Sequence, residues 1–235
     1  MKFERVSLDG CERVKGLAVV IDVLRAFTTA GYLFDAGVEK ILLVSGIDEA
    51  RQLGQRFPGS LLLGEVDGIP IPDFDLGNSP SQLPLERLRG KTIIQRTTAG
   101  TQGVVRSIHA QPIFTAALTN AAATARAIQS LNPPKVTFVL TGLLREKNVL
   151  GVADDWGDED AVCADLIEAQ LTGQSWSAED LTRRVQQSRS GRHYDGTRSA
   201  FPPPDIALAT RIDCFDFAMQ VQREDGLHIL KTVRV

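Results

Sequence analysis

Acidic, basic and hydroxyl side chains stand where three short apolar runs of the sequence end. Asp22 ends the run LAVVID (17–22), Glu65 ends SLLLGE (60–65), and Arg96 ends KTIIQR (91–96). In sheets of parallel strands covered by helices, ligands collect beyond the carboxyl ends of the strands. We therefore expect these side chains to share one site.

Carboxylates in such a site favour a hard, oxygen-preferring cation, and Mg²⁺ typically bridges protein oxygen atoms to a phosphate while keeping several waters. A zinc site is not indicated, because the three cysteines form no CxxC pair and His109, His193 and His228 share no metal-ligand spacing. We interpret the histidines as structural or surface residues. Taken singly, Asp22 or Glu65 could equally be a loop acid or a helix cap.

The turn Thr97-Thr98-Ala99-Gly100-Thr101 offers hydroxyls, backbone N–H groups and the positive end of an expected helix to an anion. It is not a Walker loop, because GxxxxGK[ST] is absent. Threonine and glycine also make ordinary strand-to-helix turns, so this turn alone does not define a phosphate site.

A long loop rich in Gly, Pro, Asp and Asn covers residues 64–80, and loops of this length in compact domains are often functional. Asp75, Asn78 and Ser79 are its best polar candidates. The alternative is an exposed connection whose turns need Asp, Gly and Asn for backbone reasons.

The elements that must position these residues follow from the hydrophobic pattern. Continuous apolar runs predict strands at 17–22, 40–45, 60–65, 91–96, 112–117 and 135–142, and the segments between them predict helices at 25–36, 47–57, 80–88 behind a cap at Ser79, and 119–131. This alternation is typical of an α/β fold, a three-layer α/β/α sandwich with a largely parallel or mixed sheet.

After residue 142 the pattern changes. A polar, acidic stretch (145–158) precedes a helix predicted at 159–171, and the acids Asp158-Glu159-Asp160 at its start would complement the helix dipole. A further helix should begin behind Ser177, with Asp180 three residues on. The basic stretch 188–198 is predicted to be an exposed loop.

The bulk properties set further limits. With 235 residues, 43% of them hydrophobic, the chain can form a single domain over 1–235, or two closely packed subdomains dividing near 130–145. A net charge of −3 with scattered Lys and Arg argues against nucleic acid. No signal sequence or membrane-spanning apolar run is visible, so we expect a cytoplasmic protein without membrane contact. A homodimer would match the usual assembly of enzymes of this size.

Five segments together resemble one family. They are VIDVLRAFTTA (20–30), GEVDGIPIPDFDLGNSP (64–80), RTTAGTQGV (96–104), AALTNAAATA (116–125) and GDEDAVCADLI (157–167). The chain resembles the 2-phosphosulfolactate phosphatase family, often called ComB-like, and the segments stand in family order across most of residues 17–167.

The resemblance implies a Mg²⁺-dependent phosphatase with a ComB-like α/β/α fold that removes phosphate from 2-phosphosulfolactate or another phosphorylated 2-hydroxy acid. Two positions depart from the family pattern. Ala99 stands where the family usually has Asn, and the stretch 145–158 is unlike the expected glycine-rich connection. Substrate preference is the property that these departures would change.

A small anionic phosphate-ester substrate needs positively charged side chains as well as a metal ion. On this basis we assign hypothetical roles to the candidate residues. Asp22, Glu65 and Asp75 would hold Mg²⁺, Glu159 or Asp160 would complete the site or orient water, and Arg25 would act with the carboxylates in catalysis. The expected substrate-binding residues are Arg25, Thr28, Thr29, Asn78, Ser79, Arg96, Thr97, Thr98, Gly100, Thr101 and Asn120. Direct attack by water is favoured, because Asp22-Val23-Leu24 lacks the second acid of a DxD signature.

Two rival functions stay open. An α/β hydrolase of the isochorismatase type would need a cysteine nucleophile on a strand-to-helix turn, whereas Cys163 lies in a predicted helix and Cys214 near the C-terminus. A non-catalytic protein that binds phosphate esters without turning them over is the second alternative.

Overall fold

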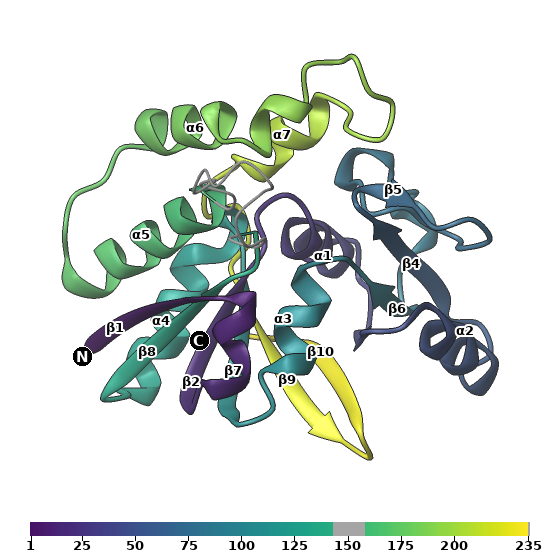
Figure 1. Cartoon of the computed structure of the whole chain (residues 1–235), viewed down its shortest axis with the longest axis horizontal. Helices are drawn as coiled ribbons and strands as arrows, with labels where there is room; N and C mark the ends of the chain where they lie inside the picture. The colour runs from purple at the N-terminus through teal and green to yellow at the C-terminus, as the bar shows by residue number, and fades with distance from the viewer. Residues whose placement is uncertain (143–157, 235) are drawn as a thin grey trace.

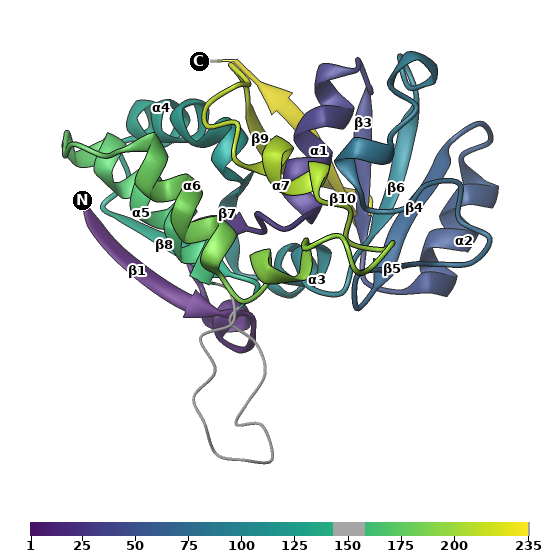
Figure 2. The ribbon, with the colours of Figure 1, turned by 90° about the horizontal axis from the view of Figure 1, so that it is seen from above.

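A computed structural model describes residues 1–142 and 158–234 of the chain. In this part, ten strands form one mixed sheet in the order β1-β8-β2-β7-β9-β10-β3-β6-β4-β5, with helices on both faces (Figures 1 and 2). The predicted α/β sandwich is therefore confirmed. None of the described helices is long and apolar enough to cross a membrane. Whether the chain is one domain or two subdomains stays a prediction.

The element bounds show where regular structure begins and ends. The strands are β1 (Lys2–Ser7), β2 (Gly16–Ile21), β3 (Lys40–Val44), β4 (Leu61–Val66), β5 (Ile69–Pro70), β6 (Thr92–Arg96), β7 (Ala110–Ala116), β8 (Lys135–Leu140), β9 (Ala218–Glu224) and β10 (Leu227–Val233). The α-helices are α1 (Ala26–Asp35), α2 (Ile47–Arg56), α3 (Gly100–Arg106), α4 (Ala121–Leu131), α5 (Asp158–Thr172), α6 (Ala178–Gln187) and α7 (Pro204–Ala209). Short 3-10 turns are η1 (Leu8–Arg13), η2 (Pro80–Gln82), η3 (Leu85–Arg87), η4 (Leu118–Asn120) and η5 (Gly191–His193).

All six predicted strands are confirmed, with bounds that differ by at most two residues. The helix predicted at 80–88 is wrong. Two separate 3-10 turns occupy this segment, because Pro84 lacks an N–H group and disfavours helical geometry at Leu83. The predicted cap Ser177 is confirmed, since its side chain accepts a hydrogen bond from the Asp180 N–H.

The sheet consists of two parallel groups joined by an antiparallel hairpin. Strands β1, β8, β2 and β7 form one group, β3, β6 and β4 form the other, and the β9–β10 hairpin pairs antiparallel with β7 on one side and β3 on the other. Three antiparallel pairings reverse the nominal direction of the second group. Twist between neighbouring strands, typically about 20–25° per pair, can offset much of such a reversal over the five pairings from β2 to β6. Residues that follow or end β2, β4 and β6 line one common cleft.

Alternating side chains assign the helices to the two faces. On β2, Val20 packs in the same core cluster as residues of α1 and α3, whereas Val19 and Ile21 pack with residues of α4, α5 and α6. On β3, Leu42 and Val44 pack with α2. This alternation buries both faces of the sheet and produces the three layers.

Candidate active site

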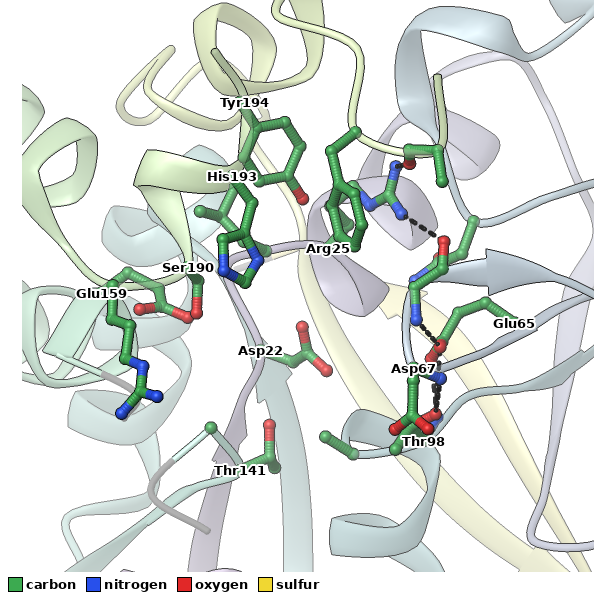
Figure 3. A pocket seen from close by; sticks show the side chains of 18 of the residues that line it. Asp22, Arg25, Glu65, Asp67, Thr98, Thr141, Glu159, Ser190, His193 and Tyr194 are labelled. Carbon is green, nitrogen blue, oxygen red and sulfur yellow. Dashed lines mark hydrogen bonds between the residues drawn. The ribbon is translucent and has the colours of Figure 1, made fainter. Parts of the chain in front are cut away.

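The converging strand ends border a cleft of about 1520 Å³ (Figure 3). Its lining comes from the ends of β2, β4, β6 and β8, the start of α5, and the segment that follows α6. Among the lining residues are Asp22, Leu24, Arg25, Glu65, Asp67, Gly68, Ile69, Asn78, Thr98, Ala99, Thr141, Glu159, Asp160, Arg189, Ser190, His193, Tyr194, Arg198 and Phe201. Of the three residues expected to share one site, Asp22 and Glu65 line this cleft, whereas Arg96 is not among its lining residues.

Asp22 lies at the meeting point of two helix starts. Its Oδ1 accepts a hydrogen bond of 2.9 Å from the Ala26 N–H of α1, and the Gly100 N–H of α3 also donates to the carboxylate. A Cβ at Gly100 would lie 2.6 Å from Asp22 Oδ2, so only glycine permits this approach. Burial, reinforced by the charge of Glu65, nevertheless raises the pKa of Asp22 to about 6.

Glu65 braces the end of β4 against the turn after β6. Its carboxylate accepts hydrogen bonds from the Thr98 N–H at 2.6 Å, the Thr98 hydroxyl at 3.0 Å and the Gly68 N–H at 2.6 Å. A carboxylate has about four acceptor positions, so three of them are filled by the protein. Glu65 consequently shapes the wall of the cleft on which Thr98 lies.

Asp160 joins α5 to the ends of two strands. Its oxygens accept hydrogen bonds of 2.9 Å from the Val23 N–H, after β2, and from the Gly142 N–H, after β8. Burial raises the pKa of Asp160 well above its ordinary value, and the charges of Glu159 and Asp22 raise it further. The N-terminus of α5 is thereby fixed beside Asp22.

Glu159 is the least satisfied of the buried acids. Its side chain is 2% exposed, and its Oε2 has no hydrogen-bond partner among the described residues. Burial raises the pKa of Glu159 to about 7, although a hydrogen bond with Ser190 opposes the shift. Figure 3 shows its carboxylate beside Ser190, across the cleft from Glu65.

The clustered carboxylates can hold a cation in one particular way. Asp22, Glu159 and Asp160 would gain stability in their ionised forms from added positive charge, and their hard oxygen atoms suit Mg²⁺. Within residues 1–142 and 158–234, however, no three His, Cys, Asp or Glu side chains form a group that could hold a metal ion. The donor set therefore fits an ion bound by one or two carboxylates, with water and substrate oxygens completing its coordination.

Arg25, expected to grip an anion, is engaged by the protein itself. Its guanidinium donates to Asp205 Oδ2 at 2.8 Å, to the Ala200 carbonyl at 2.9 Å and to the Gly68 carbonyl at 3.1 Å. The side chain is 4% exposed. Arg25 thus holds the segment before α7 against the cleft.

Most of the expected hydroxyl donors face the protein interior. The Thr28 hydroxyl donates to the Val23 carbonyl at 2.7 Å, and the hydroxyls of Thr97 and Thr101 bond to each other and to the backbone of their turn. Thr29 is buried beside the Asn78 carbonyl, 3.5 Å away. These four residues do not line the cleft, and they hold the turns on which lining residues stand.

Other expected residues divide in the same way. Asn78 lines the cleft, and its Oδ1 is buried without a hydrogen-bond partner among the described residues. Ser79 donates to Asp205, Arg96 to the carbonyls of Glu65 and Ser45, and Asn120 bonds to the backbone before α4. Asp75 lies outside the cleft lining, where its carboxylate accepts from the Leu62 N–H at 2.8 Å.

One wall of the cleft was not expected from the sequence. The basic stretch 188–198, predicted as an exposed loop, has a buried Tyr194 and contributes Arg189, His193 and Arg198 to the lining. His193 is therefore a cleft residue, and burial lowers its pKa. The aromatic residues Tyr194 and Phe201 within a polar stretch were the available signal, since exposed loops rarely need them.

The stretch 145–158, which departs from the family pattern, lies outside the described residues except for Asp158. Asp158 is the first residue of α5, and its Oδ1 accepts a hydrogen bond of 3.3 Å from the Arg189 N–H. The start of α5 and the missed wall are thus connected directly.

Comparison with known proteins gives a consistent result. A family model described as 2-phosphosulpholactate phosphatase matches residues 5–223. A Bacillus subtilis protein named "Probable 2-phosphosulfolactate phosphatase" is 31% identical over 219 residues, which cover 92% of this chain and 91% of that protein. A protein of the same name from Carboxydothermus hydrogenoformans is 46% identical over 48% of this chain and 47% of that protein. Another, from Thermosynechococcus vestitus, is 36% identical over 67% of this chain and 62% of that protein.

The raised pKa values predict how stability depends on pH. Unfolded Asp and Glu ionise near pH 4, whereas the pKa values of Asp22 and Glu159 in the folded protein are about 6 and about 7. The folded state therefore holds more protons between roughly pH 4 and 7, and the free energy of unfolding falls as pH rises through this window. In chelator-treated protein, Glu159→Gln should flatten this decline and raise the free energy of unfolding at neutral pH or above by about 1–3 kcal/mol.

Thermal and urea unfolding across this pH range measure the effect. Glu86→Gln is the matched control, because Glu86 is an exposed carboxylate on η3 and should leave the profile unchanged. An undiminished decline in Glu159→Gln would contradict the role given to this side chain.

A second prediction concerns the buried ion pair. Asp205→Ala leaves the Arg25 guanidinium without its carboxylate and also removes the acceptor of Ser79. Breaking a buried pair in this way should lower the free energy of unfolding by about 3–5 kcal/mol. Urea unfolding measures it, with Asp216→Ala as control, because Asp216 pairs with Arg234 at 4.0 Å on the surface and should contribute less than about 1 kcal/mol.

Proposed function

The chain belongs to the 2-phosphosulpholactate phosphatase family, and from this membership we propose that it is a phosphoric monoester hydrolase. Its substrate would be 2-phosphosulfolactate, converted to 3-sulfolactate and phosphate, or a related phosphorylated 2-hydroxy acid. The observation that carries the proposal is the cleft whose lining combines buried carboxylates at three element ends with Arg189 and Arg198.

Mg²⁺ is the proposed cofactor, held by Asp22 together with Glu159. Of the three ligands expected from the sequence, only Asp22 is retained. Glu65 already accepts three hydrogen bonds from the protein, and Asp75 lies outside the cleft. Glu159 replaces them because its Oε2 is buried without a partner among the described residues. When bound, Mg²⁺ would supply positive charge that offsets the charge of the phosphoryl group.

The protein side chains would supply the other parts of the reaction. Arg189 and Arg198 also line the cleft and would bind anionic oxygens of the substrate. Glu159 would orient an attacking water rather than accept its proton, because a cation held by this carboxylate lowers its pKa. Asp160 would keep Glu159 in place through its hydrogen bonds to the Val23 and Gly142 N–H groups.

The rival with a cysteine nucleophile has little support. Cys11 and Cys163 are buried and Cys214 is exposed, and none of the three is a lining residue of the cleft. Burial raises the pKa of the Cys163 thiol well above its ordinary value, which opposes formation of the nucleophilic thiolate. A cytoplasmic location and a homodimer stay predictions.

Turnover tests the proposed function directly. Chelator-stripped protein should release phosphate from racemic 2-phosphosulfolactate, 2-phospholactate or phosphoglycolate only after Mg²⁺ is added, because the metal offsets phosphoryl charge. A colorimetric phosphate assay ranks the three esters. Binding of the esters by folded protein without release in Mg²⁺ would contradict the proposal and favour the non-catalytic alternative.

Two aspartates of the family segments should behave differently. Asp22→Asn should lower kcat by about 100-fold or more, because a bound metal supplies several kcal/mol of transition-state stabilisation. Asp75→Asn is the matched control and should retain most activity, since Asp75 bonds to the Leu62 N–H away from the cleft. Steady-state kinetics over a Mg²⁺ titration measure both variants, and equal losses would refute the ligand set proposed above.

A further inference from the structure

We propose that Tyr194 is a substrate-binding residue, whose hydroxyl donates a hydrogen bond to an oxygen of the anion bound in the cleft. The proposal deepens the proposed function and rests on its assignment of the cleft as the phosphate site. Tyr194 follows η5 and lines the cleft. Figure 3 shows its hydroxyl directed into the cleft that Asp22 also lines.

The ring of Tyr194 is held in place from two sides. The Arg25 guanidinium carbon lies 5.6 Å from the ring centroid, and the Phe201 ring packs edge-on at 5.6 Å with an interplanar angle of 89°. Arg25 is in turn fixed by Asp205. A side chain constrained in this way loses little conformational entropy when its hydroxyl binds a ligand.

The chemistry of the hydroxyl suits an anion. Burial raises the pKa of Tyr194 above its ordinary value, and the neighbouring charges of Asp205, Asp22 and Glu159 act in the same direction. The phenol therefore keeps its proton at neutral pH and acts as a donor. A neutral hydroxyl can donate a hydrogen bond to a phosphate oxygen and so contribute to affinity. Because it carries no formal charge, the carboxylates of the cleft do not neutralise it.

The chain provides its own matched control. It contains two tyrosines, and the Tyr32 hydroxyl donates to the Leu208 carbonyl at 3.1 Å, away from the cleft lining. Tyr32→Phe removes the same atom as Tyr194→Phe but leaves the cleft intact. Both variants keep the aromatic rings that pack against Phe201 or Phe215.

The first experiment compares phosphate release by the two variants with Mg²⁺. Tyr194→Phe should lower kcat/KM by about 10-fold to 100-fold, the range expected for a hydrogen bond to a charged group. Tyr32→Phe should change kcat/KM by less than about 2-fold, and thermal unfolding should confirm that Tyr194→Phe is folded. Equal kcat/KM values for wild-type protein and Tyr194→Phe would overturn the proposal.

The second experiment does not depend on turnover. Protein with ring-labelled tyrosine should give two sets of NMR signals, which the two variants assign. Inorganic phosphate with Mg²⁺ should shift the Tyr194 signal saturably and leave Tyr32 unchanged, and calorimetry should show about 10-fold weaker phosphate binding by Tyr194→Phe.

The outcomes separate this proposal from the proposed function. Phosphate binding with an unshifted Tyr194 signal and equal affinity in Tyr194→Phe would overturn the role of Tyr194 and leave the phosphatase assignment standing. A shifted Tyr194 signal in a protein that releases no phosphate from any ester would support the role and overturn the phosphatase. Failure of the folded wild-type protein to bind phosphate would overturn the role.

Discussion

The burial of carboxylates at one end of the sheet is the constraint on which the other features depend. A buried ionised group is strongly unfavourable unless donors or a cation compensate it. Here backbone N–H groups supply most of the compensation. The Ala26 N–H serves Asp22, and the Val23 and Gly142 N–H groups serve Asp160. Two strand ends and two helix starts must therefore meet at one place, and Gly100 permits the third helix start to join them. The compensation is incomplete at Glu159, whose Oε2 has no partner among the described residues, and the proposed cation would complete it.

The second constraint on the cleft is the buried ion pair between Arg25 and Asp205. Arg25 immediately precedes α1 and Asp205 lies in α7, so the pair joins the end of β2 to a segment that follows it by about 180 residues. Tyr194 and Phe201 both pack against the Arg25 guanidinium, so this one side chain helps to position the wall of the cleft that the two aromatic residues form. The carboxylate side and the wall bearing arginines are thus held together by interactions that are not themselves part of the proposed chemistry.

The sequence predicted the layers because continuous apolar runs mark strands buried on both faces, and it located Asp22 and Glu65 because strand ends gather ligands. It did not reveal β1, β9 and β10, whose segments mix charged and apolar residues. It assigned ligand contacts to Thr28, Thr97 and Thr101, although residue type alone does not tell whether a hydroxyl faces a cleft or a backbone carbonyl. The wall at 188–201 escaped prediction for a different reason. Its anchor is a long-range ion pair, and the local signal that could have revealed it was the pair of aromatic residues Tyr194 and Phe201.

The C-terminal hairpin has a consequence for how the molecule is made. Within the sheet, the group holding Asp22 and the group holding Glu65 are connected only through β9 and β10, residues 218–233, in the part of the chain that the structure describes. A ribosome synthesises these strands after both groups have emerged. Each parallel group can begin to pack on its own helices, but their relative placement waits for the hairpin to be inserted between β7 and β3. Contacts so distant in sequence form slowly. The cleft is therefore complete only when the hairpin joins the two groups into one sheet.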